Sequence, residues 1–118
     1  MAWPDSIDSA PEVDIETSEG QGEPTHRTTI WAVVEDGDVY VRSLRGTRGR
    51  WYRELMASGE GVVHVGGDSY PVRAVQAADA ESIERASEGL RGKYPASRSL
   101  DSMLVEDILE TTVRLEPR

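Results

Sequence analysis

The sequence predicts a small α+β protein dominated by antiparallel strands, or a small barrel with helices at its rim. Two turn signals, Asp36-Gly37 and Gly66-Gly67-Asp68, each lie between two runs of β-branched and aromatic residues. An Asp-Gly pair in that context favours a type I′ hairpin turn, because both central residues need a positive φ. The six runs that we expect to form strands span residues 12–17, 28–35, 39–44, 62–65, 70–75 and 111–116.

Short helices are expected between these strands, where apolar residues recur every three or four positions. Gly59 is placed to end the helix that begins near Arg50, and Asp79 to cap the start of the next one. The expected helices span residues 3–7, 50–58, 80–94 and 100–108.

The composition excludes several classes of site. The 118 residues include no cysteine, which excludes disulfides, thiolate catalysis and cysteine-bound metal centres. The longest apolar run, residues 30–34, is far too short to cross a membrane. The N-terminus has neither a basic start nor an apolar stretch, so we expect a cytoplasmic protein without a membrane partner.

The chain is expected to form one domain overall, with an acidic N-terminal segment at residues 1–24 and the main domain at residues 25–118. The acidic segment carries seven acids and no base, and contains one predicted helix and one predicted strand. Since residues 1–10 hold few apolar side chains, we expect that their removal leaves the fold intact.

The most distinctive feature is an arginine-rich stretch, residues 42–53, with five arginines and no acid. The net charge of −9 makes nucleic acid an improbable partner, whereas a local basic patch suits a small anion. Tyr40 and Arg42 share one face of their strand, opposite Val39 and Val41, so we expect this face to meet solvent, a ligand or another subunit. The alternative is a solvated basic loop that balances the acidic segment.

No catalytic constellation is visible. His26 and His64 lie far apart and no carboxylate pattern completes a metal site with either. The serines lack the G-x-S-x-G context of a nucleophile. Trp31 and Trp51 are candidates either to stack on a planar cofactor or to fill the core.

Six short segments along residues 27–118 carry a resemblance to a known family. They are Arg27-Thr-Thr-Ile-Trp31, residues 36–43, Gly46, Trp51-Tyr52-Arg53, Lys93-Tyr94 and residues 112–118. Together they resemble an uncharacterised bacterial family, domain of unknown function 2255. That family is similar in fold to the split β-barrel flavin and deazaflavin proteins, which include pyridoxamine phosphate oxidase and deazaflavin-dependent nitroreductases.

The resemblance implies a six-stranded antiparallel split β-barrel with short helices at the rim, commonly a homodimer. It further implies a flavin-type cofactor, FMN or F420, in a groove near the subunit interface. The strand 28–31 would lie along the cofactor ring. The strand after the first hairpin turn, together with the loop that follows this strand, would hold the cofactor phosphate. The implied cofactor-binding residues are Thr29, Trp31, Tyr40, Arg42, Ser43, Arg45, Gly46, Arg48 and Arg50.

The leading hypothesis is therefore a flavin- or deazaflavin-binding, oxidoreductase-like protein of unknown substrate. The main alternative is a non-catalytic dimeric binding or assembly module that kept the barrel and lost the cofactor. A third is a protein that sequesters another planar anion. A homodimer is expected because Trp31, Val33 and Tyr40 would otherwise expose apolar surface.

Overall fold

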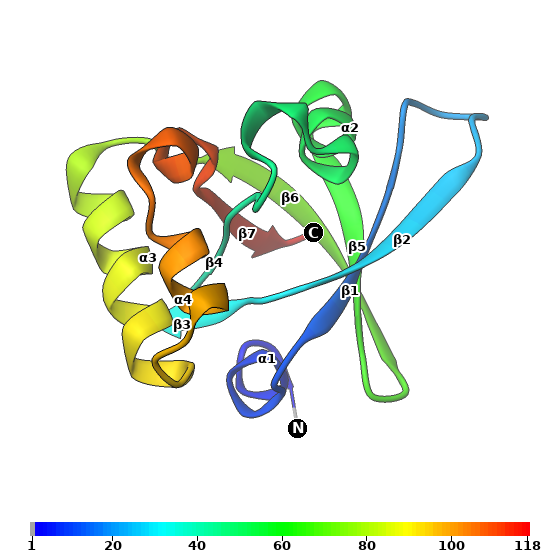
Figure 1. The fold of residues 1–118 in the computed structure, drawn as a ribbon. Helices are drawn as coiled ribbons and strands as arrows, with labels where there is room; N and C mark the ends of the chain where they lie inside the picture. The colour runs from blue at the N-terminus through cyan, green and yellow to red at the C-terminus, as the bar shows by residue number, and fades with distance from the viewer. Residues whose placement is uncertain (1) are drawn as a thin grey trace.

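The chain forms a seven-stranded antiparallel sheet that curls toward a barrel, with short helices around it (Figure 1). The computed structural model describes residues 2–118. Its strands are β1 (Val13–Ser18), β2 (Thr25–Ile30), β3 (Val33–Glu35), β4 (Asp38–Val41), β5 (Glu60–Val65), β6 (Asp68–Gln76) and β7 (Val113–Pro117). Its helices are α1 (Asp5–Ser9), α2 (Arg50–Ser58), α3 (Ala80–Lys93) and α4 (Arg98–Met103), with the 3-10 turns η1 (Gly46–Arg48) and η2 (Glu106–Thr111).

The predicted number of six strands is wrong, because the apolar run 28–35 forms two strands instead of one. It breaks at Trp31 and Ala32, so that β2 pairs with β1 whereas β3 pairs with β4. The carbonyl oxygen of Ala32 accepts hydrogen bonds from the Lys93 ammonium at 2.7 Å and from the Tyr94 hydroxyl at 3.4 Å. These side-chain donors replace a strand partner at the break, which lets the chain change its neighbours.

The break also explains the barrel shape. The strand order is β2-β1-β5-β6-β7-β4-β3, so the two ends of the sheet are joined directly by the residues between β2 and β3. A sheet whose two edge strands are consecutive in the chain must curl until its ends approach each other. The predicted class, a mainly antiparallel barrel with helices at its rim, is confirmed.

Most of the turns and helix ends lie where the sequence predicts them. Asp36 and Gly37 both have positive φ, 52° and 84°, as a type I′ turn requires. Gly59 ends α2 in the left-handed conformation, and the Asp79 side chain accepts from the Ser82 N–H at the start of α3. The single helix expected over residues 100–108 is wrong, since extended backbone at Val105 separates α4 from η2.

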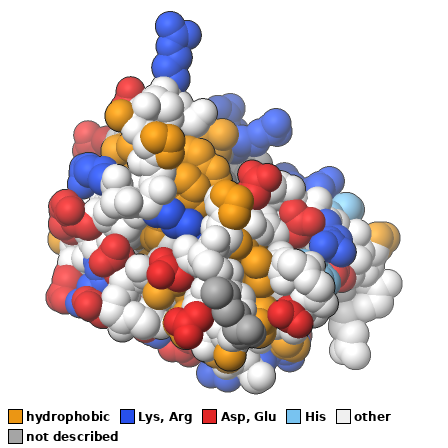
Figure 2. All heavy atoms as spheres, turned by 90° about the horizontal axis from the view of Figure 1, so that it is seen from below, with side chains coloured by type: hydrophobic (Ala, Val, Ile, Leu, Met, Phe, Trp, Pro, Cys, Tyr) orange, Lys and Arg blue, Asp and Glu red, His pale blue; other side chains and the backbone are white. Residues whose placement is uncertain are grey.

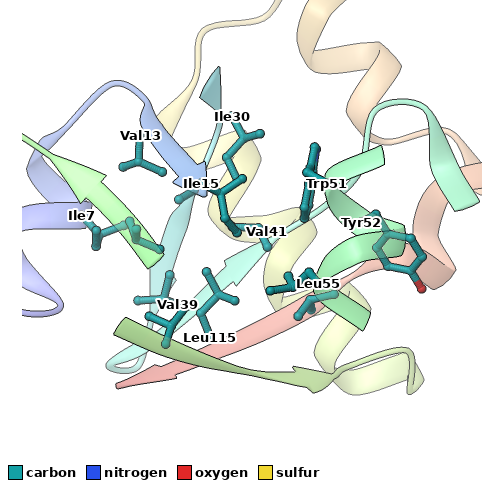
Figure 3. Close-up of a cluster of buried hydrophobic side chains, with 14 residues drawn as sticks. Ile7, Val13, Ile15, Ile30, Val39, Val41, Trp51, Tyr52, Leu55 and Leu115 are labelled. Atoms are coloured by element: carbon teal, nitrogen blue, oxygen red, sulfur yellow. The ribbon is translucent and has the colours of Figure 1, made fainter. Parts of the chain in front are cut away.

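The sheet separates two hydrophobic clusters. The barrel interior holds side chains from α1, α2 and several strands, which point toward one another in Figure 3. The second cluster lies beneath α3 and α4, which sit together on one side of the barrel in Figure 1. Tyr40 belongs to this second cluster, and Arg42, 2% exposed, bonds to backbone oxygens of Ile83 and Met103 on the same side. The expectation that Tyr40 faces solvent, a ligand or another subunit is therefore wrong.

The acidic N-terminal segment is built into the barrel. The Ile7 side chain is fully buried in the interior, and its carbonyl accepts a hydrogen bond from Lys93 at 2.9 Å. The Ser6 hydroxyl bonds to the Tyr70 hydroxyl at 2.9 Å. β1 lies between β2 and β5, with Val13 and Ile15 in the interior. These contacts contradict the expectation that residues 1–10 are dispensable for the fold.

The surface carries charges of both signs. On the face shown in Figure 2, acidic and basic side chains surround an area of hydrophobic side chains. Among residues 2–118, no helix is long and apolar enough to cross a membrane.

We predict that the substitution Lys93→Met lowers the free energy of unfolding by about 1–3 kcal/mol, because the Ile7 and Ala32 carbonyls lose a donor within the fold. Urea unfolding followed by circular dichroism measures this. The matched control is Arg91→Met on the same helix, which removes exposed ion pairs and should cost under about 1 kcal/mol. Equal losses for the two variants would contradict the role of Lys93.

Candidate functional site

A groove of about 720 Å³ lies between β2, the segment that follows β4, the start of α2 and α4. The residues that line it are Glu12, Thr28, Thr29, Ile30, Trp31, Arg42, Ser43, Leu44, Arg45, Gly49, Arg50, Trp51, Arg98, Ser99, Ser102 and Met103. The groove therefore joins four separate stretches of the chain, at residues 12, 28–31, 42–51 and 98–103.

Six of the predicted cofactor-binding residues line this groove: Thr29, Trp31, Arg42, Ser43, Arg45 and Arg50. Tyr40, Gly46 and Arg48 do not. Tyr40 is 3% exposed within the cluster beneath α3, and Gly46 is buried next to the Ile108 side chain. The groove thus contains most of the residues that the resemblance implied. Two of the implied residues, Tyr40 and Gly46, are instead buried in the protein.

Arg42 is the buried cation of the groove wall. Its guanidinium donates to the Thr112 hydroxyl at 2.9 Å, to the Met103 carbonyl at 2.9 Å and to the Ile83 carbonyl at 3.1 Å. Burial, together with the charge of Arg91, lowers the pKa of Arg42 to about 10, so the side chain stays charged at neutral pH. Arg42 connects β4, α3, α4 and the segment before β7, and holds its charge without a carboxylate partner.

Ser43 shapes the loop behind the groove. Its hydroxyl donates to the Gly46 carbonyl at 2.8 Å, and its backbone N–H donates to the Thr111 hydroxyl at 3.0 Å. Gly46 has a φ of +63°, which favours glycine, and a Cβ on Gly49 would stand 2.5 Å from the Ser43 hydroxyl oxygen. Both glycines are therefore required by the loop that carries Arg45 and leads into α2.

The charge of the groove is unusual for this acidic protein. Across residues 2–118, six of the twelve arginines form an ion pair with a carboxylate: Arg27, Arg73, Arg85, Arg91, Arg114 and Arg118. The six that form none are Arg42, Arg45, Arg48, Arg50, Arg53 and Arg98. Four of these line the groove, and Glu12 is the one acid among the lining residues. Positive charge without internal compensation is concentrated there.

Arg98 was not predicted as a site residue. It is the first residue of α4, it is exposed, and it lines the same groove as Arg45 and Arg50. No signal in the sequence links it to Arg45 or Arg50, because only the packing of α4 against α3 and the barrel brings it there.

Aromatic rings form part of the groove wall. Trp31 is half-buried and stacks on Tyr94, with ring centroids 3.9 Å apart and planes 6° from parallel. The Tyr94 hydroxyl donates to the Pro11 carbonyl at 2.8 Å, and burial raises the pKa of Tyr94 to about 12. Trp51 is 7% exposed and contributes to both the groove and the barrel interior. Trp31, held in place by its stacking on the buried Tyr94, presents a flat surface to the groove.

The donor set of the groove is suited to binding, not to acid–base or metal chemistry. No histidine lines it, and residues 2–118 contain no group of three or more histidine or acidic side chains able to hold a metal ion. Guanidinium groups bind phosphate and carboxylate oxygens, and flat aromatic walls bind planar rings. The arrangement can hold a planar molecule that carries anionic groups.

The sequence matches the model of a known protein family. The family model described as "Uncharacterized protein conserved in bacteria (DUF2255)" matches residues 5–115. No curated protein matches the chain.

Three solved structures have a similar fold at low identity. A putative pyridoxamine 5′-phosphate oxidase from Listeria innocua is 16% identical with a TM-score of 0.66, covering 97% of this chain and 89% of its own. An F420-H2 dependent reductase is 17% identical with a TM-score of 0.67, covering 90% and 94%. The heme storage protein from Vibrio cholerae is 12% identical with a TM-score of 0.72, covering 97% and 86%. The predicted resemblance to split-barrel proteins is confirmed.

We predict that Arg42→Ala lowers the free energy of unfolding by about 2–4 kcal/mol, because it leaves buried acceptors of α3 and α4 without their donor. Arg45→Ala serves as the matched control, and we expect a change within about 0.5 kcal/mol, since its side chain is exposed. Thermal and urea unfolding of both variants provide the measurement. An unchanged free energy of unfolding in Arg42→Ala would show that these buried hydrogen bonds do not stabilise the fold.

Proposed function

The chain belongs to the bacterial family described as uncharacterized and conserved in bacteria (DUF2255), and on this premise we propose that it is an oxidoreductase-like protein that binds FMN or the deazaflavin F420 in the groove. The observation that carries the proposal is the gathering of four arginines without carboxylate partners around one groove with an aromatic wall. An anionic molecule with a planar ring matches both features.

The residues present fit such a cofactor. The groove volume of about 720 Å³ falls in the usual range of about 300–1,000 Å³ for small-molecule sites. Arg45, Arg50 and Arg98 are exposed and form no ion pair, so their guanidinium groups are available to phosphate oxygens. An anion there would also offset the buried charge of Arg42.

Each part of the groove has a distinct role in this proposal. Arg45, Arg50 and Arg98 would bind the anionic groups, and Trp31 would contact the ring while Tyr94 holds its orientation. Arg42 and Ser43 would fix the loop from behind, since their hydrogen-bond donors are largely used inside the protein. When bound, the cofactor supplies hydride or electron transfer, and the protein supplies binding and orientation.

The similar structures support a cofactor-binding fold without selecting the cofactor. One is described as a putative pyridoxamine 5′-phosphate oxidase, one as an F420-H2 dependent reductase and one as a heme storage protein. Of the side chains that commonly ligate haem iron, the groove has only Met103 among its lining residues, with no histidine, cysteine or tyrosine. Its arginines favour a phosphate-bearing flavin or deazaflavin.

We also propose a homodimer, on a different basis from the one first expected. Val33 and Tyr40 are covered within the chain, but Leu44 is 59% exposed on the groove. A second subunit that covers Leu44 would remove this apolar surface from water. Sedimentation at tens of micromolar should give twice the mass of one chain, and Leu44→Lys should shift the equilibrium toward the monomer. A wild-type monomer at that concentration would contradict the proposal.

The cofactor site is tested by replacing the three exposed groove arginines, Arg45, Arg50 and Arg98, with Ala in one variant. We expect the Kd for FMN or F420, measured by fluorescence quenching, to rise at least tenfold. A loss of about 1.4 kcal/mol is enough for that change, and a single charge-assisted hydrogen bond contributes about 1.5–3 kcal/mol. The substitutions should weaken the binding of riboflavin, which lacks the phosphate, less than the binding of FMN.

The matched control is Arg53→Ala, which removes an exposed arginine of α2 that forms no ion pair and does not line the groove. Its affinity for FMN and F420 should equal that of the wild type. Binding that is insensitive to the three groove arginines would place the ligand elsewhere. No binding of FMN or F420 by the wild type would favour the non-catalytic assembly module.

A further inference from the structure

A second constellation of reactive side chains lies on the sheet, outside the groove. It consists of Glu16 on β1, His64 on β5 and Ser69 on β6. His64 stands directly opposite Ser69 in the β5–β6 register and directly opposite Asp14 in the β1–β5 register. Because side chains alternate along a strand, these residues point away from the barrel interior, which holds Ile15 and Val63. None of the three lines the groove.

The three side chains form a continuous hydrogen-bond chain from a hydroxyl through an imidazole to a carboxylate. The Ser69 hydroxyl oxygen is 2.9 Å from His64 Nδ1, and His64 Nε2 is 2.6 Å from Glu16 Oε1. An ionised carboxylate only accepts, so the Nε2 hydrogen of neutral His64 donates to Glu16. Nδ1 is then the acceptor for the Ser69 hydroxyl. This is the connectivity that activates a serine for nucleophilic attack.

The sheet holds this chain in place. Asp14, the other carboxylate near His64, is bound by the Thr29 hydroxyl at 2.7 Å and by Arg27 at 3.1 Å, and these bonds lower the pKa of Asp14. Asp14 is thereby paired with β2, and Glu16 is left as the partner of His64. The His64 and Glu16 side chains are 18% and 26% exposed, and Ser69 is exposed to solvent.

We propose that Ser69 is a nucleophile, activated by His64 and Glu16, that accepts acyl groups from small activated esters. In this step the Ser69 oxygen forms a bond to the acyl carbon, and the bond between that carbon and the leaving alkoxide or phenolate oxygen breaks. The Ser69 proton moves to His64 Nδ1, and the resulting imidazolium is stabilised by Glu16 before it returns a proton to the leaving group or to water. No atom is oxidised or reduced, and the product is an acylated Ser69.

The site is independent of the proposed cofactor groove and requires no cofactor. Since Ser69 is exposed, it can meet a small acyl donor from solution. Ser58 offers a matched reference within the same chain, because it is also exposed but its hydroxyl donates to the Glu60 carbonyl and contacts no histidine.

The experiment treats the full chain with 4-nitrophenyl acetate at pH 8 and follows acetylation of each serine by peptide mass mapping. We expect Ser69 to be acetylated at least about tenfold faster than Ser58, since a positioned general base typically contributes about 10²–10⁴-fold. His64→Gln should lower the rate at Ser69 to that at Ser58, and Glu16→Gln should lower it in part. His26→Gln, which removes the other histidine, should leave it unchanged.

Equal rates at Ser69 and Ser58 in the wild type would overturn the proposal without any variant. A rate at Ser69 that survives His64→Gln would also overturn it. Circular dichroism checks that each variant is folded. If His64→Gln is not folded, the wild-type comparison and Glu16→Gln decide, and an unchanged rate in Glu16→Gln then counts against the relay.

Discussion

The fold and the groove both depend on one carbonyl group, that of Ala32. The backbone hydrogen bonds between strands are interrupted at Ala32. Lys93 and Tyr94, at the end of α3, donate to its carbonyl in place of a neighbouring strand. A buried carbonyl without a partner would destabilise the fold, so the break is tolerated only while α3 is docked. Lys93 also binds the Ile7 carbonyl, which attaches α1 to the same point. The adjacent Trp31 stacks on Tyr94, and thus the contact that lets the sheet change partners also orients one wall of the groove.

The groove combines a rigid back with an open, positively charged front. Arg42 is held by backbone and hydroxyl oxygens of three segments. The backbone N–H and the hydroxyl of Ser43 also both donate hydrogen bonds within the protein. These residues have few donors left for a ligand. The arginines in front of them are exposed and unpaired, in a chain whose net charge is −9. Such a division favours a preorganised anion site, because the loop does not have to be ordered when the ligand binds.

The polar face of the sheet shows how register alone creates a second site. β1, β5 and β6 are neighbours, and their outward positions bring Glu16, His64 and Ser69 into contact. The inward positions of the same strands fill the barrel. One sheet therefore supplies the core on one face and a polar hydrogen-bond chain on the other, separate from the groove.

The sequence by itself determined the features that depend on neighbouring residues. The type I′ turn at Asp36-Gly37 and the bounds of α2 follow from backbone preferences and spacing within a few positions, and both were predicted. Six residues of the groove were also implied by the family resemblance, and five of the six lie within two short segments around the first hairpin. Tertiary structure decided the rest. The division of residues 28–35 into two strands depends on Lys93, some sixty residues away, and the burial of Arg42 depends on α3 and α4. Arg98 entered the groove for the same reason: its position is set by helix packing, which no local pattern encodes.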